Sequence, residues 1–216
     1  MLLIAHRGNN NHNFSENSKE AIYNCLNDDN IVGIEIDVRI TKDKKLVLIH
    51  DPVIDFISDG NGIVKYMNLA ELRKYQYGKG KSPLATLEEV LAMYNEKTLL
   101  IELKEIGNDY IDLVDELVKT IHNYSHLNIY VSSFNFNLLN YLKSNYPFIK
   151  CGLIIGYGLN MLKINNNFDF YVIQYRLLEL LPPKKDIFVF SVPTNISLKI
   201  SNETKIITDT AYKFLN

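Results

Sequence analysis

Residues 32–51, VGIEIDVRITKDKKLVLIHD, place two apolar runs, 32–38 and 46–49, on either side of a short connector at 40–45. Parallel neighbours in a sheet need a crossover of about a dozen residues or more, so this connector predicts an antiparallel hairpin. A hairpin centred between Lys42 and Asp43 would set Glu35 roughly opposite His50. The run 46–49 is therefore expected to be an accessory strand that folds back over the end of a larger sheet.

The rest of the chain alternates short β-branched runs with longer amphipathic stretches, a pattern typical of parallel βα units. The expected strands are 2–5, 32–38, 46–49, 99–103, 128–132, 150–155, 170–174, 187–192 and 205–208. The expected helices are 18–28, 69–76, 86–94, 108–124, 135–145 and 158–163, with weaker ones near 177–181 and after 210. Without the accessory strand, eight strands remain, which predicts an α/β fold of the (β/α)8 TIM-barrel type with its active site at the C-terminal strand ends.

The turn-rich segment 52–82 interrupts this alternation, with Asp59-Gly60-Asn61-Gly62 and Gly78-Lys79-Gly80 as turn material. We expect it to be a small insertion within one domain that spans residues 1–216.

Bulk composition excludes several classes of protein. The chain has 216 residues, is 47% hydrophobic and carries a formal net charge of -2, without the basic balance of a general nucleic-acid binder. No apolar stretch is long enough to span a bilayer, and no signal peptide is expected. The two cysteines form no motif, so we expect a cytoplasmic protein.

Ionisable residues stand at or near the ends of four apolar runs. His6 and Arg7 follow the first run, and His50 ends the accessory strand. Glu35 and Asp37 lie in the run between them, and a later run supplies a further pair, Glu102 and Lys104. Burying such groups is costly unless they are paired, so their recurrence at strand ends predicts one active site at the barrel rim.

Glu35 and Asp37 are two residues apart on a strand and therefore share a face. If that face lines the barrel, Glu102 from the next strand can join them. Converging carboxylates repel one another, and a hard divalent cation held by oxygen ligands would relieve the repulsion, with Ca²⁺ or Mg²⁺ favoured over zinc. An alternating strand with a solvated acidic face is the alternative interpretation.

His6 and His50, each a common structural residue when alone, predict an acid–base pair when the fold brings them together. Arg7 offers a fork that matches phosphate oxygens, and Lys104 can contact phosphate or neutralise the carboxylates. Asn17 is expected either to cap the first helix or to face the ligand.

Ten stretches, in this order, resemble the glycerophosphodiester phosphodiesterase family. They are Ile4–Gly8, Glu16–Ser18, Glu35–Val38, Thr41–Asp43, His50–Asp51, Asn68–Leu72, Ala85–Leu91, Ile101–Lys104, Ser132–Phe134 and Ile206–Asp209. The resemblance implies a TIM barrel with a small insertion after the second strand and hydrolysis of glycerophosphodiesters to glycerol 3-phosphate and an alcohol. It further implies calcium or magnesium as cofactor, Glu35, Asp37 and Glu102 as metal ligands, His6 and His50 as the acid–base pair, and Arg7 and Lys104 as phosphate contacts.

The chain departs from the family pattern at several points. Ser15 stands where the family usually has proline, Phe190 where it usually has tryptophan, and Pro193 where it usually has asparagine. Phe190 is thus expected in a substrate pocket that is wider than usual and tolerant of different alcohols.

Two alternative functions remain open from the sequence. A phospholipase-like relative with the same two-histidine barrel would release a cyclic phosphate. A non-catalytic barrel would bind phosphorylated ligands or a protein partner. The leaving alcohol, the physiological metal, the role of each histidine and the oligomeric state are not specified by the sequence.

Overall fold

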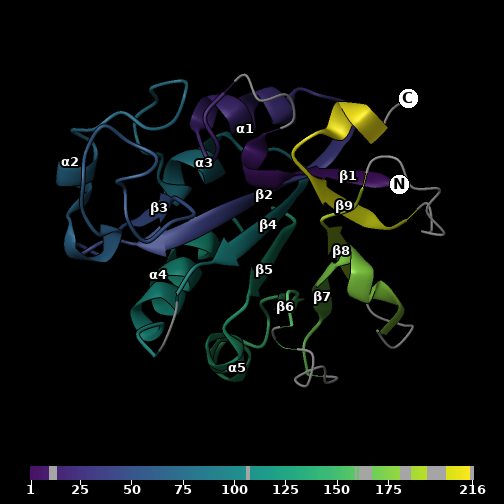
Figure 1. Cartoon of the computed structure of the whole chain (residues 1–216). Coiled ribbons are helices and arrows are strands. Elements are labelled where there is room, and N and C mark those ends of the chain that lie inside the picture. Colours follow the sequence, from purple (N-terminus) through teal and green to yellow (C-terminus); the bar gives the residue numbers. More distant parts are fainter. Residues whose placement is uncertain are drawn as a thin grey trace.

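A computed structural model describes residues 1–9, 14–105, 108–158, 160, 167–180, 186–193 and 203–214, apart from the side chain of residue 212. Its strands form one sheet with the order β1-β9-β8-β7-β6-β5-β4-β2-β3, and a further β1–β2 pairing closes eight of them into a parallel barrel (Figure 1). The predicted TIM barrel is confirmed. The strands are β1 (Leu2–Ala5), β2 (Ile31–Ile40), β3 (Leu46–Leu48), β4 (Thr98–Leu103), β5 (Ile129–Ser133), β6 (Cys151–Ile155), β7 (Phe170–Gln174), β8 (Asp186–Phe190) and β9 (Lys205–Thr208).

Strand β3 is the expected accessory strand and pairs antiparallel with β2. The register differs by one residue from the prediction, because Val38 pairs with Leu48 and the hairpin is centred on Asp43. Residues 41–45 form the turn. In it the Thr41 hydroxyl donates to Asp43 Oδ1 at 2.6 Å, and Lys44 adopts a positive φ of 57°. His50 therefore lies beyond the end of the ladder rather than opposite Glu35.

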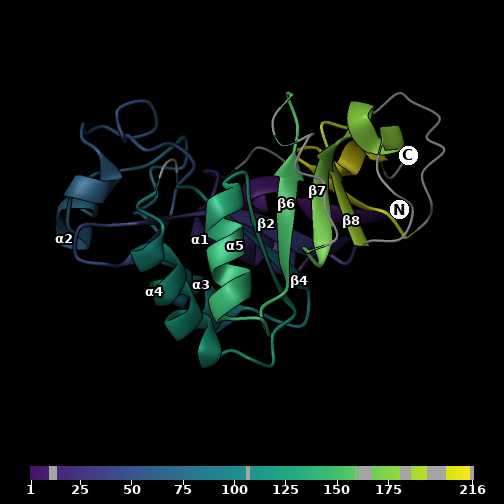
Figure 2. The ribbon, with the colours of Figure 1, turned by 90° about the horizontal axis from the view of Figure 1, so that it is seen from below.

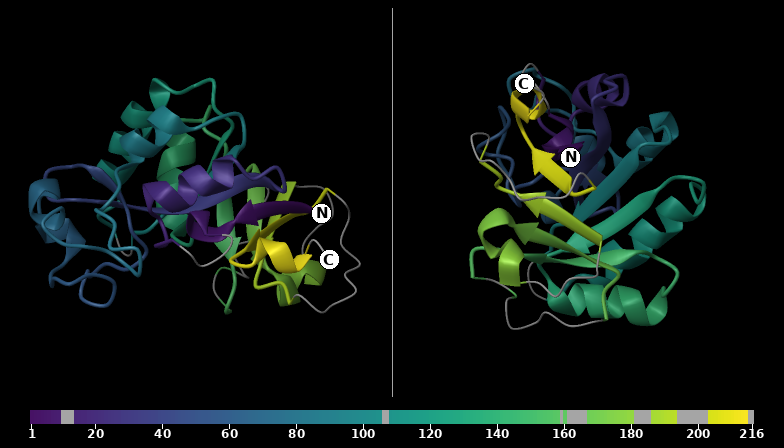
Figure 3. Two further views of the ribbon diagram at one scale, coloured as in Figure 1. Left: turned by 90° about the horizontal axis from the view of Figure 1, so that it is seen from above. Right: turned by 90° about the vertical axis from the view of Figure 1, so that its right-hand side faces the viewer.

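The helices cover the outside of the barrel. They are α1 (Lys19–Leu26), α2 (Leu69–Leu72), α3 (Leu87–Met93), α4 (Ile111–His122) and α5 (Phe136–Asn145), with 3-10 turns at His6–Gly8, Val64–Tyr66, Tyr175–Leu180 and Ala211–Phe214. The two weak helices expected near 177–181 and after 210 are thus 3-10 turns, and most of the helix expected at 158–163 lies outside the described residues. Views from below and from above show α4 and α5 outside the strands (Figures 2 and 3).

Local signals explain where two of these helices begin. The Ser18 hydroxyl accepts a hydrogen bond from Ala21 N and caps α1. Thr86 and Glu89 form a reciprocal capping box at the start of α3. None of the described helices is long and apolar enough to cross a membrane.

An apolar cluster fills the barrel interior and is separate from the larger core that includes the helices. Its fully buried members come from alternate positions of the strands, and two aromatic rings, Phe170 and Phe188, pack against Tyr130 with centroids 5.2 and 5.3 Å away. This packing fills the barrel below its C-terminal end, so the floor of the mouth is apolar. The buried members are Ile4, Leu100, Ile154, Phe170, Val172, Phe188 and Ile207.

The segment 52–82 carries α2 and lies to one side of the barrel, beyond the end of β2 (Figures 1 and 2). Ile54, Val64, Leu72 and Tyr77 form an apolar cluster there, together with Val47 of β3. Its description as an insertion within one domain of residues 1–216 stays a prediction.

Gly33 of β2 tests how tightly the barrel is closed. A Cβ at this position would lie 2.6 Å from the Thr98 carbonyl oxygen of β4, which is backbone and cannot rotate away. We expect Gly33→Ala to lower the free energy of unfolding by about 1–3 kcal/mol through overpacking. Chemical denaturation would measure this, with the exposed Glu96→Ala as the control that stays within about 0.5 kcal/mol of the parent protein. An unchanged stability in Gly33→Ala would contradict the close approach of β2 and β4.

Candidate active site

The barrel mouth contains a cavity of about 540 Å³. Seven of the eight residues expected in the site line it, and the eighth, Asp37, is fully buried on β2. The lining members of the predicted set are His6, Arg7, Glu35, His50, Glu102, Lys104 and Phe190.

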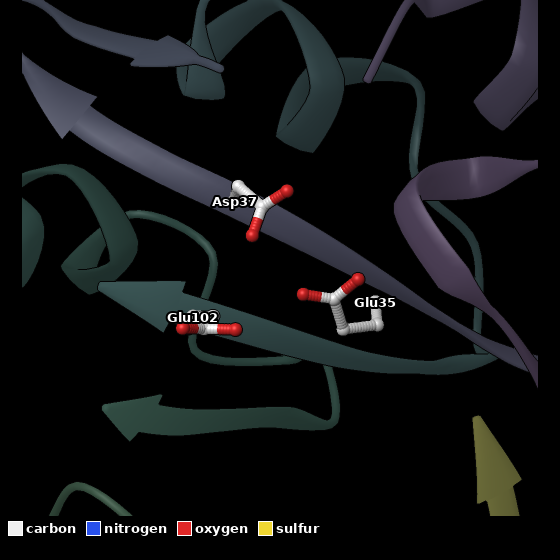
Figure 4. A group of neighbouring side chains, drawn as sticks. All are labelled: Glu35, Asp37 and Glu102. Atoms are coloured by element: carbon white, nitrogen blue, oxygen red, sulfur yellow. The ribbon is translucent and has the colours of Figure 1, made fainter. Parts of the chain in front are cut away.

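Three carboxylates converge at the mouth, as Figure 4 shows. Glu35 and Asp37 project from one face of β2, and Glu102 stands beside Asp37 because the two are register partners in the β2–β4 ladder. One oxygen from each of Glu35, Asp37 and Glu102 lies within 4.8 Å of the others. The predicted convergence is confirmed, and the alternative of a solvated acidic face is wrong, since Glu35 and Asp37 are 3% and 0% exposed.

The electrostatics of this cluster favour a cation. Burial and the neighbouring charge of Asp37 raise the pKa of Glu35 to about 8. Burial also raises the pKa of Glu102, although Lys104 opposes this. Glu35 Oε1 is buried and has no hydrogen-bond partner among the described residues. An unsatisfied buried acceptor is costly, so the cluster fits a hard divalent cation, for which carboxylate oxygens are suitable ligands.

Asp37 is stabilised in its charged form. Burial alone would raise its pKa, but the charges of Lys104 and Arg7 hold it below the usual range. Lys104 Nζ lies 3.1 Å from Asp37 Oδ1, and Arg7 Nε lies 3.2 Å from Oδ2. Both pairs are within ion-pair distance but outside hydrogen-bond geometry, so Arg7 Nε and Asp37 Oδ1 are buried without a hydrogen-bond partner among the described residues. The Asn17 amide donates to Asp37 Oδ2 at 2.9 Å and its oxygen accepts from Asp37 N.

Lys104 links two of the carboxylates, because its Nζ also lies 2.6 Å from Glu102 Oε1. The salt bridge expected for Lys104 is therefore present. Arg7 is held differently: its backbone N–H donates to Glu35 Oε2 at 3.0 Å and its guanidinium donates to Glu16 at 2.6 Å. Arg7 and Gly8 both have positive φ, 52° and 66°, and this turn aims the Arg7 N–H back at β2.

Each histidine is backed by a carboxylate. His6 Nδ1 donates to Asp209 Oδ1 at 2.6 Å, and His50 Nδ1 donates to Asp51 Oδ1 at 2.7 Å, because an ionised carboxylate can only accept. Nε2 of each ring is thereby left for the cavity, and His6 Nε2 lies 3.8 Å from Glu35 Oε2.

The two imidazoles differ in proton affinity. Burial would lower the pKa of His6, but the hydrogen bond to Asp209 and the charge of Glu35 outweigh it and raise that pKa to about 9. Burial and the charge of Lys104 hold the pKa of His50 below its usual value. A cation bound among the carboxylates would offset the charge of Glu35 and thereby lower the pKa of His6 again.

Sequence reasoning missed two residues that organise the site. Asp209 directly follows the strand Lys205–Thr208, so it shows the same signal as His6, an ionisable residue at a strand end. Arg39 continues the alternation of Glu35 and Asp37 on β2. Its guanidinium donates to the His50 carbonyl at 2.9 and 2.7 Å and to the Lys104 carbonyl at 2.5 Å, which ties the two segments together.

The other candidates are Asn17, the stretch Ser132–Phe134 and two further histidines. The helix cap is Ser18, so the cap interpretation of Asn17 is wrong; its side chain holds Asp37 instead, and a role toward the ligand stays a prediction. In the matched stretch Ser132–Phe134, Ser132 lines the cavity, whereas Ser133 is buried outside it and donates to the Leu103 carbonyl at 2.8 Å. His122 lines a different cavity near the end of α4, and His12 lies outside the described residues.

A closed eight-stranded parallel barrel whose polar groups gather at the C-terminal strand ends defines the class of TIM-barrel enzymes. Comparison with known proteins narrows this class. Residues 6–175 match the model of the glycerophosphoryl diester phosphodiesterase family. The chain belongs to this family, and its enzymatic class is that of a glycerophosphodiester phosphodiesterase.

Individual relatives agree with this membership. A glycerophosphodiester phosphodiesterase of Caldanaerobacter subterraneus is 35% identical over 167 residues, which cover 73% of this chain and 68% of the relative. A putative glycerophosphodiester phosphodiesterase of Bacillus subtilis is 33% identical over 173 residues, covering 76% and 70%.

Solved structures share the fold. A phosphodiesterase of Oleispira antarctica, solved in complex with the product sn-glycerol-3-phosphate, superposes with a TM-score of 0.84 at 21% identity, covering 100% of this chain and 95% of that one. A glycerophosphodiester phosphodiesterase of Agrobacterium tumefaciens gives a TM-score of 0.79 at 18% identity, with 100% of both chains covered.

The carboxylate cluster predicts cation binding that can be measured without any substrate. At about a hundredfold excess over its Kd, Ca²⁺ or Mg²⁺ should raise Tm by roughly 5–10 °C, because binding to the folded state alone stabilises it. Glu102→Gln should lose most of this shift, whereas the exposed Glu96→Gln should keep it. A thermal shift of equal size in Glu102→Gln and the parent protein would contradict a cation site at the barrel mouth.

Proposed function

We propose that the chain hydrolyses glycerophosphodiesters to glycerol 3-phosphate and an alcohol, with a divalent cation and with His6 and His50 as the acid–base pair. The observation that carries this proposal is the convergence of three carboxylates, two of them buried and one partly buried, and two carboxylate-backed histidines at one cavity of about 540 Å³. The Oleispira relative, which holds sn-glycerol-3-phosphate, supports the choice of product.

The substrate phosphate would be bound by Arg7 and Lys104. Both cations line the cavity and are tied to carboxylates, Arg7 to Glu16 and Lys104 to Glu102. These pairs hold the two cations in place before substrate arrives. The planar guanidinium can then present parallel N–H groups to two phosphate oxygens, and Lys104 adds a compact positive charge.

Glu35, Asp37 and Glu102 would hold the cation, Ca²⁺ or Mg²⁺ by the oxygen character of the set. When bound, a divalent cation withdraws charge from a phosphoryl oxygen and stabilises negative charge that develops on it. Asn17 and Lys104 keep Asp37 ionised and in place for this role.

The two histidines would move the protons. One imidazole removes a proton from the attacking hydroxyl, whether of water or of the substrate's own glycerol, and the other protonates the leaving alkoxide. Asp209 and Asp51 hold the rings by Nδ1, so that Nε2 of each ring exchanges the proton. Attack by the glycerol hydroxyl would pass through a cyclic phosphate that water then opens.

Phe190 would form an apolar wall for the glycerol part of the substrate. It lines the cavity at the end of β8, and its ring packs against Tyr157 with a centroid distance of 6.0 Å. A wall built from two packed aromatic rings offers mainly apolar surface. We therefore propose modest affinity for the glycerol moiety and broad tolerance of the alcohol.

A substrate panel tests the proposed function. Glycerophosphocholine, glycerophosphoethanolamine and glycerophosphoglycerol should each release glycerol 3-phosphate with Ca²⁺, Mg²⁺ or Mn²⁺, and exhaustive EDTA should abolish the activity. Phosphorus NMR would identify the products. Accumulation of a cyclic phosphate as the end product would favour the phospholipase-like alternative, and binding without turnover would favour the non-catalytic one. Full activity in EDTA would exclude the metal-dependent mechanism.

Removing either histidine should damage the chemical step. We expect His6→Ala and His50→Ala each to lower kcat by about 10²–10⁴, the range typical of general acid–base catalysis. The double variant should lose much less than the product of the two effects, because groups that act as a unit are not additive. The exposed His122→Ala serves as the control with unchanged kcat. A wild-type kcat in either single variant would show that this histidine is structural and not catalytic.

A further inference from the structure

A second cavity lies beside the barrel mouth, between the loop that follows β1 and the segment 52–82. It has a volume of about 290 Å³. Phe14 and Ser15 line it from the loop, and Ile57 and Tyr77 line it from the segment. The fold and the proposed mechanism leave this cavity without a role.

Arg7 and His50 line both cavities. The larger cavity also holds Glu35, Glu102 and His6, which the smaller one does not. A phosphate bound at Arg7 would therefore lie where the two cavities meet, and His50 would be accessible from both cavities.

Ser15 fastens the two walls of the smaller cavity to each other. Its hydroxyl donates to the Tyr77 carbonyl at 3.0 Å and accepts from Gly80 N at 2.9 Å, and the residue is 5% exposed. The approach is close, because a Cβ on Gly78 would lie 2.6 Å from the Ser15 hydroxyl oxygen. A proline at position 15, as is usual in the family, has no hydroxyl to make these bonds.

The same loop continues into the phosphate-binding groups. Glu16 pairs with Arg7, and Asn17 exchanges two hydrogen bonds with Asp37. The wall of the smaller cavity and the groups that flank the phosphate thus belong to one short piece of chain, and Ser15 sets its position against residues 77–80.

A phosphodiester carries two arms on one phosphorus atom, and these arms diverge from each other. We propose, building on the proposed function, that the smaller cavity receives the alcohol arm while the glycerol phosphate stays in the larger one, and that Ser15 is a positioning residue for this alcohol subsite. The arm that departs then occupies the cavity without the carboxylate cluster, and the phosphate that remains keeps its contact with the cluster.

The lining specifies the class of alcohol. A volume of about 290 Å³ is at the lower end for ligand sites, which suits a short alcohol of the size of ethanolamine, choline or glycerol. The charged side chains balance, with Arg7 and Lys79 against Glu16 and Asp51, and therefore select neither a cationic nor a neutral alcohol strongly.

Ser15→Ala tests the subsite, with Ser58→Ala as a matched control. Ser58, in the segment 52–82, makes the same kind of bond pair, to the Ile54 carbonyl at 2.9 Å and from Gly60 N at 3.1 Å, but does not line the cavity. We expect Ser15→Ala to raise KM for the three glycerophosphodiesters by about tenfold and unequally, because polar groups of Tyr77 and Gly80 lose their partner. The Ki of sn-glycerol 3-phosphate, which lacks the alcohol arm, should stay unchanged, and Ser58→Ala should change neither constant.

Lys79→Trp provides a second test that does not depend on a buried group. Lys79 is exposed at the rim of the cavity, so a large ring there should raise KM for glycerophosphocholine more than for glycerophosphoethanolamine. Lys74→Trp, at an exposed lysine of the same segment outside the cavity, is the matched control.

Two outcomes would overturn the subsite. One is a Ki for sn-glycerol 3-phosphate that rises in parallel with KM in Ser15→Ala or Lys79→Trp, which would show that the substitution acts on the phosphate or glycerol site and not on a separate alcohol subsite. The other is equal effects in the variants and their matched controls. Both require a parent protein that hydrolyses the diesters; absence of hydrolysis by the parent protein would instead refute the proposed function itself.

Discussion

The crowding of three carboxylates, two buried and one partly buried, at the mouth of a closed barrel is the constraint around which the surrounding structure is arranged. Glu35, Asp37 and Glu102 lie within 4.8 Å of one another, above an apolar interior that offers them no compensation. Compensation comes from other segments: Lys104 from the end of β4, Arg7 from the turn after β1, and the loop that carries Asn17. The groups that neutralise the cluster are the same groups that we propose for binding phosphate.

Much of the fold follows from local patterns in the sequence. The connector at 40–45 is too short for a crossover, and this alone separates the accessory strand from the eight strands of the barrel. The register of the hairpin could not be predicted, because it depends on one turn residue, Lys44, which adopts a positive φ. A slip of one residue reverses the faces of a strand, so side chains on β3 were the least predictable part of the fold.

The site was predictable where chemistry and strand ends coincide. His6, His50 and Glu102 carry that signal, and the structure brings them to one cavity. Arg39 also follows the run 32–38, but its role could not be predicted, because its partners are the backbone carbonyls of His50 and Lys104, which residue types do not reveal. The smaller cavity was not predictable either, since it exists through contacts between Ser15 and residues far along the chain.

Strand β2 performs two tasks that are usually separate. It closes the barrel between β1 and β4 and carries Glu35 and Asp37, and its far end continues into the hairpin from which the segment 52–82 is suspended. That segment can therefore change in length or in sequence without shifting the acidic cluster, because the β2–β4 ladder holds the carboxylates in place independently of it. The architecture separates the reaction centre from part of the proposed alcohol subsite, so changes in residues 52–82 and in the facing loop around Ser15 could accommodate a different leaving group.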